Sequence, residues 1–173
     1  MKILLHICCG ICSSAAIQTL QEEGMEVVGY FYNPNIYPRE EYERRLAVAR
    51  QVAATFGIAL VEGEYDSDSW DTAVTGLEGE PEGGRRCSVC FALRLRATSR
   101  KAQEMGIMQI ATTLSISPHK DAELINALGK EIDPAAYKEY NFKKKDGFKK
   151  TIDFAKAHQL YRQHYCGCRF GLP

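Results

Sequence analysis

The chain has 173 residues, of which 45% are hydrophobic and 25% charged, so it is long enough for one domain with a hydrophobic core and short for two. Its 22 basic and 22 acidic residues cancel, so total charge gives no case for nucleic-acid binding and leaves only a local basic patch for that role. No apolar run approaches the ~20 residues of a membrane span, and the N-terminus lacks the apolar core of a signal peptide, so we expect a cytoplasmic protein without a membrane partner.

Apolar runs alternate along the chain with segments whose apolar residues recur every three or four positions. These patterns predict, in chain order, strand 2–8, helix 13–23, strand 26–34, helix 38–56, strand 58–65, a glycine- and acid-rich loop 75–86, helix 88–105, strand 108–117, a short helix 118–128 and helix 151–159. The basic and aromatic residues 130–150 receive no assignment. The tail 160–173 is either irregular or a last strand.

The predicted strands are continuously apolar rather than alternating, which is typical of a parallel sheet covered by helices on both faces. We therefore expect a single α/β domain over residues 1–173, with a mostly parallel sheet flanked by helices. In such sheets the ligand site lies beyond the carboxyl ends of the strands. The residues expected to share that rim are Cys8, Cys9, Asn33, Tyr65, Asp66 and 115–120.

Seven cysteines are concentrated in three short segments. An odd number leaves at least one thiol outside any intramolecular disulfide set, and clustered cysteines in a reducing compartment are more often metal ligands or catalytic thiols than crosslinks. Cysteines used only as small core side chains would be scattered singly. The three groups are Cys8/Cys9/Cys12, Cys87/Cys90 and Cys166/Cys168.

The middle group is a CxxC motif at a predicted helix start, where unpaired amides and the helix dipole favour thiolate over thiol. Arg85 and Arg86 precede it and act in the same direction. With the first group it offers five thiolates on one rim, and four suit either a structural zinc or an iron–sulfur cluster. The vicinal Cys8 and Cys9 make a poor zinc knuckle, because neighbouring side chains diverge on an extended backbone. We favour a cluster; zinc and a thioredoxin-like dithiol at the CxxC are the alternatives.

The third group, Cys166-Gly167-Cys168, places two thiols two residues apart. Such residues point the same way on an extended chain, and a disulfide between them would be strained and easily reduced. The motif therefore suits a redox-active pair, or two ligands to one metal ion, better than a structural crosslink.

Five motifs in order give the chain a family resemblance. They are HICCGICS at 6–13, FYNPNIYPREEYERR at 31–45, RCSVCFALRL at 86–95, TTLSISPHKD at 112–121 and YRQHYCGCRFG at 161–171. With these segments the chain resembles the QueH-type, cobalamin-independent epoxyqueuosine reductases over nearly its whole length. The resemblance implies a fold related to the adenine-nucleotide α-hydrolase (HUP-like) group, and an enzyme that removes the epoxide oxygen of epoxyqueuosine at the wobble position of tRNA.

The same resemblance implies cofactors and roles for the cysteines. Cys8, Cys9, Cys87 and Cys90 would hold a [4Fe-4S] cluster. Cys166 and Cys168 match the redox-active CGC pair of the family. Cys12 matches a position where some relatives carry an aspartate proposed to hold a separate iron, so a second, mononuclear iron is expected near Cys12 and the Cys166/Cys168 pair.

Substrate contacts are expected from polar, basic and aromatic residues at the rim. Polar residues at a strand end suit a nucleoside pocket, and basic residues beside aromatic ones suit phosphate contacts and base stacking in tRNA. The residues expected to contact substrate are Asn33, Asn35, Tyr37, Arg44, Arg45, Lys120 and Tyr165. Segment 140–150 (YNFKKKDGFKK) has five lysines and three aromatic residues, and is either a tRNA-binding surface or an ordinary solvated segment.

The reaction itself defines further needs. Deoxygenating an epoxide consumes two electrons and two protons, so an electron donor, not identified by the sequence, and a proton donor are required. The available proton donors are Lys120, His119, His164 and Tyr165. Two other functions stay open: a zinc-stabilised nucleic-acid-binding module without catalysis, and a cluster-dependent tRNA thiolation enzyme. The latter needs an ATP loop, and no SGGxDS-type phosphate loop follows the first strand.

Overall fold

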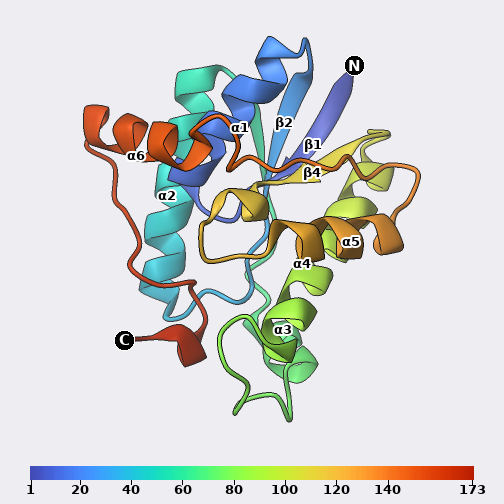
Figure 1. Ribbon diagram of the computed structural model, residues 1–173, viewed down its shortest axis with the longest axis vertical. Coiled ribbons are helices and arrows are strands. Elements are labelled where there is room, and N and C mark those ends of the chain that lie inside the picture. The colour runs from blue at the N-terminus through green and yellow to red at the C-terminus, as the bar shows by residue number, and fades with distance from the viewer.

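Four short apolar segments form a parallel sheet in the computed structural model, which covers residues 1–173 (Figure 1). The strand order is β3-β2-β1-β4, so β2 and β3 lie on one side of β1, and β4 pairs with its other side. Leu4 of β1 pairs with Val28 of β2 and with Ile110 of β4. The strands are β1 (Lys2–His6), β2 (Glu26–Phe31), β3 (Ala59–Glu62) and β4 (Ile110–Thr112).

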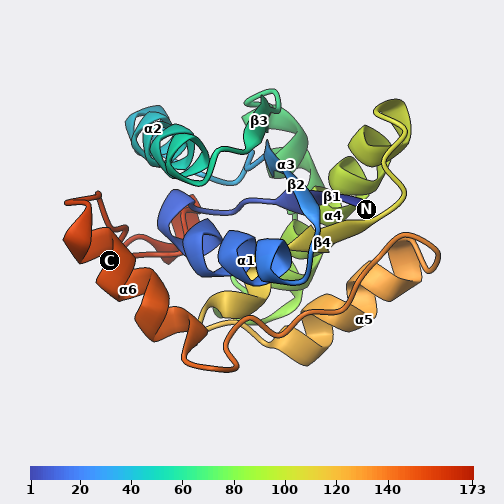
Figure 2. The ribbon, with the colours of Figure 1, turned by 90° about the horizontal axis from the view of Figure 1, so that it is seen from above.

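Helices cover both faces of this sheet (Figure 2). Helices α1, α2 and α6 lie against one face, and α4 and α5 pack together on the other. No helix is long and apolar enough to cross a membrane. The helices are α1 (Gly10–Glu22), α2 (Arg39–Phe56), α3 (Ser67–Ala73), α4 (Arg85–Glu104), α5 (Ala122–Ile132) and α6 (Gly147–Ala157), with short 3-10 turns η1 (Thr113–Ile116) and η2 (Arg169–Gly171).

Strand β1 explains why the strand pattern is continuously apolar. Ile3, Leu5 and Ile7 belong to the core shared with α1 and α2, whereas Leu4 belongs to the core shared with α4. All four side chains are fully buried. The expected α/β fold with a parallel sheet flanked by helices is confirmed.

Helix α1 begins at Gly10, earlier than the predicted Ser13. It lies very close to α2, because a β-carbon on Gly10 would be 2.5 Å from the backbone nitrogen of Ala49. The early start puts Cys9 at the N-cap and Cys12 within the first helical turn.

Several other element ends differ from the prediction because local polar contacts decide them. The fourth strand ends at Thr112 rather than 117, since the Thr112 hydroxyl accepts a hydrogen bond from the Leu114 amide and the chain turns into η1. Helix α5 begins at Ala122 rather than Pro118, since Asp121 accepts hydrogen bonds from the first free amides of the helix.

Further differences concern the other strands, the CxxC helix, the last helix and the tail. Strands β1 and β2 end at His6 and Phe31 rather than at 8 and 34, and α6 spans Gly147–Ala157 rather than 151–159. The third strand ends at Glu62 rather than Tyr65, and α4 begins at Arg85 rather than Ser88. The short helix α3, which Asp66 caps, was not predicted. The tail after α6 is irregular and contains no strand.

Candidate metal and redox site

The carboxyl ends of β1 and β4 meet at the point where the strand order reverses, which is where parallel sheets of this kind bind ligands. Cys8 follows β1, and its amide donates a hydrogen bond to the Thr113 hydroxyl at 3.1 Å. That hydroxyl in turn lies 3.3 Å from the Cys8 sulfur as a donor. The two strand ends are therefore joined directly at the first thiol group.

The first thiol group is a tight triad. The sulfur atoms of Cys8, Cys9 and Cys12 all lie within 4.8 Å of one another. Hydrogen bonds from Cys12 and Cys9 hold the pKa of Cys8 well below its usual value, while burial raises that of Cys9 to about 12. The hydrogen bond with Cys8 raises the pKa of Cys12. Negative charge in the triad is therefore favoured on Cys8 over Cys9 and Cys12.

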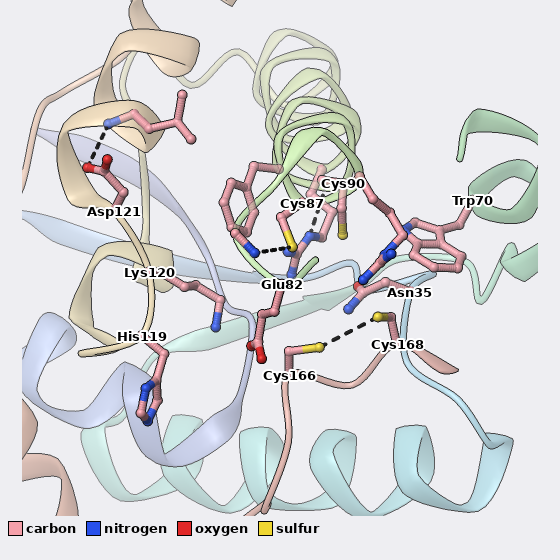
Figure 3. A pocket seen from close by; sticks show the side chains of 15 residues that line it. Asn35, Trp70, Glu82, Cys87, Cys90, His119, Lys120, Asp121, Cys166 and Cys168 are labelled. Atoms are coloured by element: carbon pink, nitrogen blue, oxygen red, sulfur yellow. Dashed lines mark hydrogen bonds between the residues drawn. The ribbon is translucent and has the colours of Figure 1, made fainter. Parts of the chain in front are cut away.

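The other four cysteines line one cleft (Figure 3). Figure 3 shows Cys87 and Cys90 on α4 above the cleft, with Cys166 and Cys168 on the returning tail. Cys90 and Cys168 also share a small apolar cluster with Trp70. The cleft is lined by Asn35, Trp70, Glu82, Gly83, Arg86, Cys87, Cys90, Phe91, Arg94, His119, Lys120, Asp121, Leu124, Cys166 and Cys168.

The CxxC pair sits in the first two turns of α4. The Gly83 amide donates a hydrogen bond to the Cys87 sulfur at 3.3 Å, but burial raises the pKa of this thiol. The Gly83 amide and Arg86 lower the pKa of Cys87, as expected at a helix start, but desolvation outweighs them.

The CGC thiols face each other across 3.6 Å. Interaction with the Cys168 thiol lowers the pKa of Cys166 to about 6, and the same interaction raises the pKa of Cys168. At neutral pH the motif is thus a thiolate beside a thiol. No disulfide is present among the seven cysteines.

Lys120 influences thiols of both the Cys8/Cys9/Cys12 triad and the CGC pair. Its positive charge lowers the pKa of both Cys8 and Cys166. Its carbonyl accepts a hydrogen bond from the Lys143 ammonium. Cys8 and Cys87 also pack against the same apolar cluster of Phe91, Leu114 and Ile125, so the CCxxC and CxxC motifs flank one patch of core.

This donor set fits an iron–sulfur cluster. Soft thiolate ligands select zinc, copper(I) or iron–sulfur clusters over hard cations, and all seven thiols are free. Three are preassembled in the triad, and Cys87 and Cys90 face the adjacent cleft. Cys12 belongs to the triad as closely as Cys8 and Cys9 do.

The tail that carries the CGC motif is fixed by buried charges. The Arg45 guanidinium pairs with Glu41 at 2.8 Å and donates hydrogen bonds to the carbonyls of Tyr165 and Cys166. The Tyr161 hydroxyl also donates to Glu41. Arg45 was predicted to contact substrate, but its side chain is 3% exposed and its hydrogen bonds are made within the protein.

The other residues expected to contact substrate are divided between the cleft and its surroundings. Asn35, Lys120 and His119 line the cleft, and the Asn35 Oδ1 is buried without a hydrogen-bond partner. Asn33 is fully buried and donates to the Ile7 carbonyl at 2.8 Å, which holds the strand end. Tyr37 is exposed beside the cleft, in the groove that Asn35 and Trp70 also line.

Three further residues lie around the tail. The Tyr165 hydroxyl donates a hydrogen bond to the Tyr37 carbonyl. Arg44 is exposed, with its guanidinium 5.6 Å from the centre of the Tyr161 ring. His164 is exposed and does not line the cleft.

Most lysines of segment 140–150 are exposed to solvent, but not all of its aromatic rings are. Phe142 is buried and stacks on Tyr140, whose hydroxyl donates a hydrogen bond to Glu23. Only Phe148 is substantially exposed. Tyr140 and Phe142 therefore pack against the core, and of the two alternatives for this segment, a tRNA-binding surface would depend on its lysines and Phe148.

Trp70 and Arg94 line the cleft without having been predicted as site residues, and the burial of Arg86 was not expected. Trp70 is buried with its indole Nε1 unpartnered, and Arg86 and Arg94 are each 3% exposed. Trp70 could have been found, since Asp66 followed by Trp70 and Val74 is a capped helix with apolar residues four apart. The buried arginines give no sequence signal, because most arginines are exposed.

The comparisons with known proteins agree with this geometry. The family model described as epoxyqueuosine reductase QueH matches residues 3–173. This chain is a member of the QueH family. It is 38% identical to the QueH of Streptococcus pyogenes serotype M1, over 96% of this chain and 69% of that protein. It is 37% identical to the QueH of Haemophilus influenzae, over 99% of this chain and 71% of that protein.

A more distant likeness concerns the fold alone. The U34-tRNA thiolase NcsA from Methanococcus maripaludis, solved with its [4Fe-4S] cluster, superposes with a TM-score of 0.57 at 16% identity. The match covers 100% of this QueH chain and 62% of the thiolase chain. The α/β fold of this chain is therefore one that the thiolase shares.

Proposed function

We propose that this QueH chain reduces epoxyqueuosine to queuosine at the wobble position of tRNA. The observation that carries the proposal is membership of the QueH family over residues 3–173, supported by a thiol-lined cleft at the switch point of the sheet. Free thiols throughout the chain suit a reducing cytoplasm.

The cysteines divide into a metal-holding set and a redox pair in this proposal. Cys8, Cys9, Cys87 and Cys90 hold a [4Fe-4S] cluster, which supplies one-electron transfer when bound. Cys12 completes the triad and, with the CGC pair, is the place for a second iron. These assignments rest on the motif match and on the shared rim of the sheet.

The CGC pair can supply both electrons of the reaction. Oxidation of the Cys166 thiolate and the Cys168 thiol to a disulfide releases two electrons and one proton, and a proton donor in the cleft supplies the second proton. The epoxide loses both carbon–oxygen bonds to one oxygen, which leaves as water, and an alkene forms. The Cys166 thiolate, with its pKa of about 6, is the nucleophile of the pair that would react with the substrate, while Cys168 keeps its proton. An external electron donor then reduces the disulfide for the next turnover.

Lys120 is the proton donor that the geometry supports best. It lines the cleft, and its positive charge lowers the pKa of both Cys8 and Cys166. An epoxide bound between these thiols would have the Lys120 ammonium beside it, where it could protonate the leaving oxygen. Tyr165 is less suited, because its hydroxyl already donates to the Tyr37 carbonyl. Asn35 and Tyr37 would contact the nucleoside, and Arg44 with the exposed lysines of segment 140–150 would contact tRNA phosphates.

Anaerobic incubation of the reconstituted protein with epoxyqueuosine-containing tRNA and a reductant, followed by nucleoside analysis, tests the function. Queuosine should appear. Cys87→Ala or Cys90→Ala should lose the cluster and activity together, whereas Cys166→Ala should keep the cluster and lose turnover. A protein that binds iron and tRNA but leaves the epoxide intact would contradict the proposal.

The two alternative functions give different results in the same assay. A zinc-stabilised binding module would be colourless, carry zinc and form no queuosine. A thiolation enzyme would place sulfur on tRNA and require ATP. The structural neighbour is a thiolase, but at 16% identity the likeness shows the fold alone.

A further inference from the structure

Two buried arginines line the thiol cleft without an acidic partner. Arg86 and Arg94 are each 3% exposed, and both contribute to the wall that carries Cys87 and Cys90. Neither guanidinium has a carboxylate oxygen within 4.0 Å among the ion pairs of the molecule. Buried charges are normally paired, because removal from water is costly.

The hydrogen bonds of these arginines go only to neutral oxygens. Arg94 donates to the Cys90 carbonyl and to the Asn33 side-chain oxygen, each at 3.3 Å. Arg86 donates to the carbonyls of Leu77, Glu78 and Glu80, and its Nε has no partner. Each guanidinium also lies over an aromatic ring, Arg86 at 4.9 Å from the centre of Phe170 and Arg94 at 5.7 Å from the centre of Phe91. These contacts satisfy donors and favour the cations, but no carboxylate neutralises either charge.

The acidic groups of the cleft do not supply the missing charge. Glu82 and Asp121 line it, but Glu82 is exposed, and Asp121 caps the first amides of α5. Lys120 adds a further positive charge to the same space. The lining of the cleft therefore carries more positive than negative charge, and the two buried positive charges, Arg86 and Arg94, are on the helix that carries the CxxC thiols.

We infer that Arg86 and Arg94 are countercharges for an anionic, thiolate-bound iron–sulfur cluster at the wall of this cleft that carries Cys87 and Cys90, and that they raise its reduction potential. This inference rests on the proposed function. Four thiolates around a [4Fe-4S]²⁺ core form a dianion, and net charge near a cluster is one of the factors that set its potential. Adding an electron increases the negative charge, so a fixed positive charge close by favours the reduced form.

The test compares reduction potentials of reconstituted variants by anaerobic spectroelectrochemical titration, with iron and sulfide content measured in parallel. Arg94→Gln should disfavour reduction about tenfold, which is about 59 mV lower for a one-electron couple. Arg94→Lys keeps the charge and should stay near the wild-type potential. Arg96→Gln is the matched control, since Arg96 is on the same helix but exposed.

The outcomes separate the inference from the proposed function. An Arg94→Gln protein that keeps its cluster at the wild-type potential overturns the inference, even if the wild type reduces epoxyqueuosine. If Arg94→Gln takes up no iron, recovery of iron in Arg94→Lys supports the inference, and failure of Arg94→Lys overturns it. A wild type that binds no iron contradicts both proposals.

Discussion

Glycine is required at two positions beside the CGC thiols. Gly167 between them has a φ of +117°, which L side chains rarely adopt, and a β-carbon there would lie 2.9 Å from an Arg45 nitrogen. At Gly171, a β-carbon would be 2.6 Å from the Cys166 sulfur and 3.7 Å from the Cys168 sulfur. The final G of the YCGCRFG motif therefore makes room for the reactive sulfurs.

Gly171→Ala should displace the Cys166 sulfur without touching the metal-holding thiols. We expect a loss of epoxide reduction of about tenfold or more, since small misplacements of reacting groups cost rate steeply. Iron content should be unchanged. Gly79→Ala is the control, because a β-carbon at Gly79 meets nothing within 4 Å. Equal activity of the two variants would show that the Gly171 contact is irrelevant to catalysis.

The low pKa of Cys166 predicts its reactivity. In the reduced, metal-free protein, alkylation of Cys166 should rise through a midpoint near pH 6, because the thiolate is the nucleophile and forms above the pKa of about 6. Cys168→Ala removes the main cause of that low pKa, so the midpoint should move to higher pH. Peptide mapping of the alkylated protein distinguishes Cys166 from Cys8. An alkylation midpoint that is the same in Cys168→Ala and in the wild type would show that Cys168 does not lower the pKa of Cys166.

At the scale of elements, the tail is attached to α2 by a buried ion pair. Arg45→Met should leave Glu41 buried without its cation and release the carbonyls of Tyr165 and Cys166. Breaking a buried pair in this way costs about 3–5 kcal/mol of unfolding free energy. Thermal or denaturant unfolding measures this loss.

Arg44→Met provides the control for the tail prediction, since Arg44 is the exposed neighbour on the same helix. Surface substitutions usually change stability by no more than about 0.5 kcal/mol. The Arg45→Met protein should also be cleaved faster by proteases between α6 and the CGC motif. Equal stability of the two variants would show that Arg45 does not hold the tail.

The elements themselves were predictable in type more than in extent. Apolar runs and helical periodicity located all four strands and five of the six helices, because burial on both faces of a parallel sheet leaves a strong sequence pattern. The ends were not predictable, because single capping side chains such as Thr112 and Asp121 fix them. The early start of α1 mattered most, since it moved Cys12 into the triad.

For the candidate site, the cysteine positions were predictable, whereas the contacts between distant segments were not. The motifs placed the cysteines on one rim, as strand order and connection predict for residues that follow parallel strands. Pairing between distant segments was beyond the sequence: Arg45 reaches the tail across 121 residues of chain, and the buried Arg86 and Arg94 resemble exposed arginines in the sequence. Such contacts depend on the final packing rather than on local pattern.

For the whole molecule, a net charge of zero conceals an uneven distribution. Lys144, Lys145 and Lys150 are exposed and form no ion pair with a carboxylate, whereas Lys149 pairs with Asp153. The segment joins the cleft through the hydrogen bond from Lys143 to the Lys120 carbonyl. If tRNA enters the cleft with its wobble nucleoside, its backbone should meet these three lysines.

Changing Lys144, Lys145 and Lys150 together to alanine should therefore weaken tRNA binding and reduce its salt dependence. Each phosphate contact on single-stranded nucleic acid contributes a slope of about −0.7 to log K against log salt, so losing three should reduce the slope by about 2. The control changes Lys2, Lys101 and Lys130, which remove the same total charge but are ion-paired elsewhere. Binding isotherms at several salt concentrations measure both slopes. Equal slopes for the two triple variants would mean that net charge, rather than this segment, governs tRNA binding, and the lysines of 140–150 would then be an ordinary solvated surface.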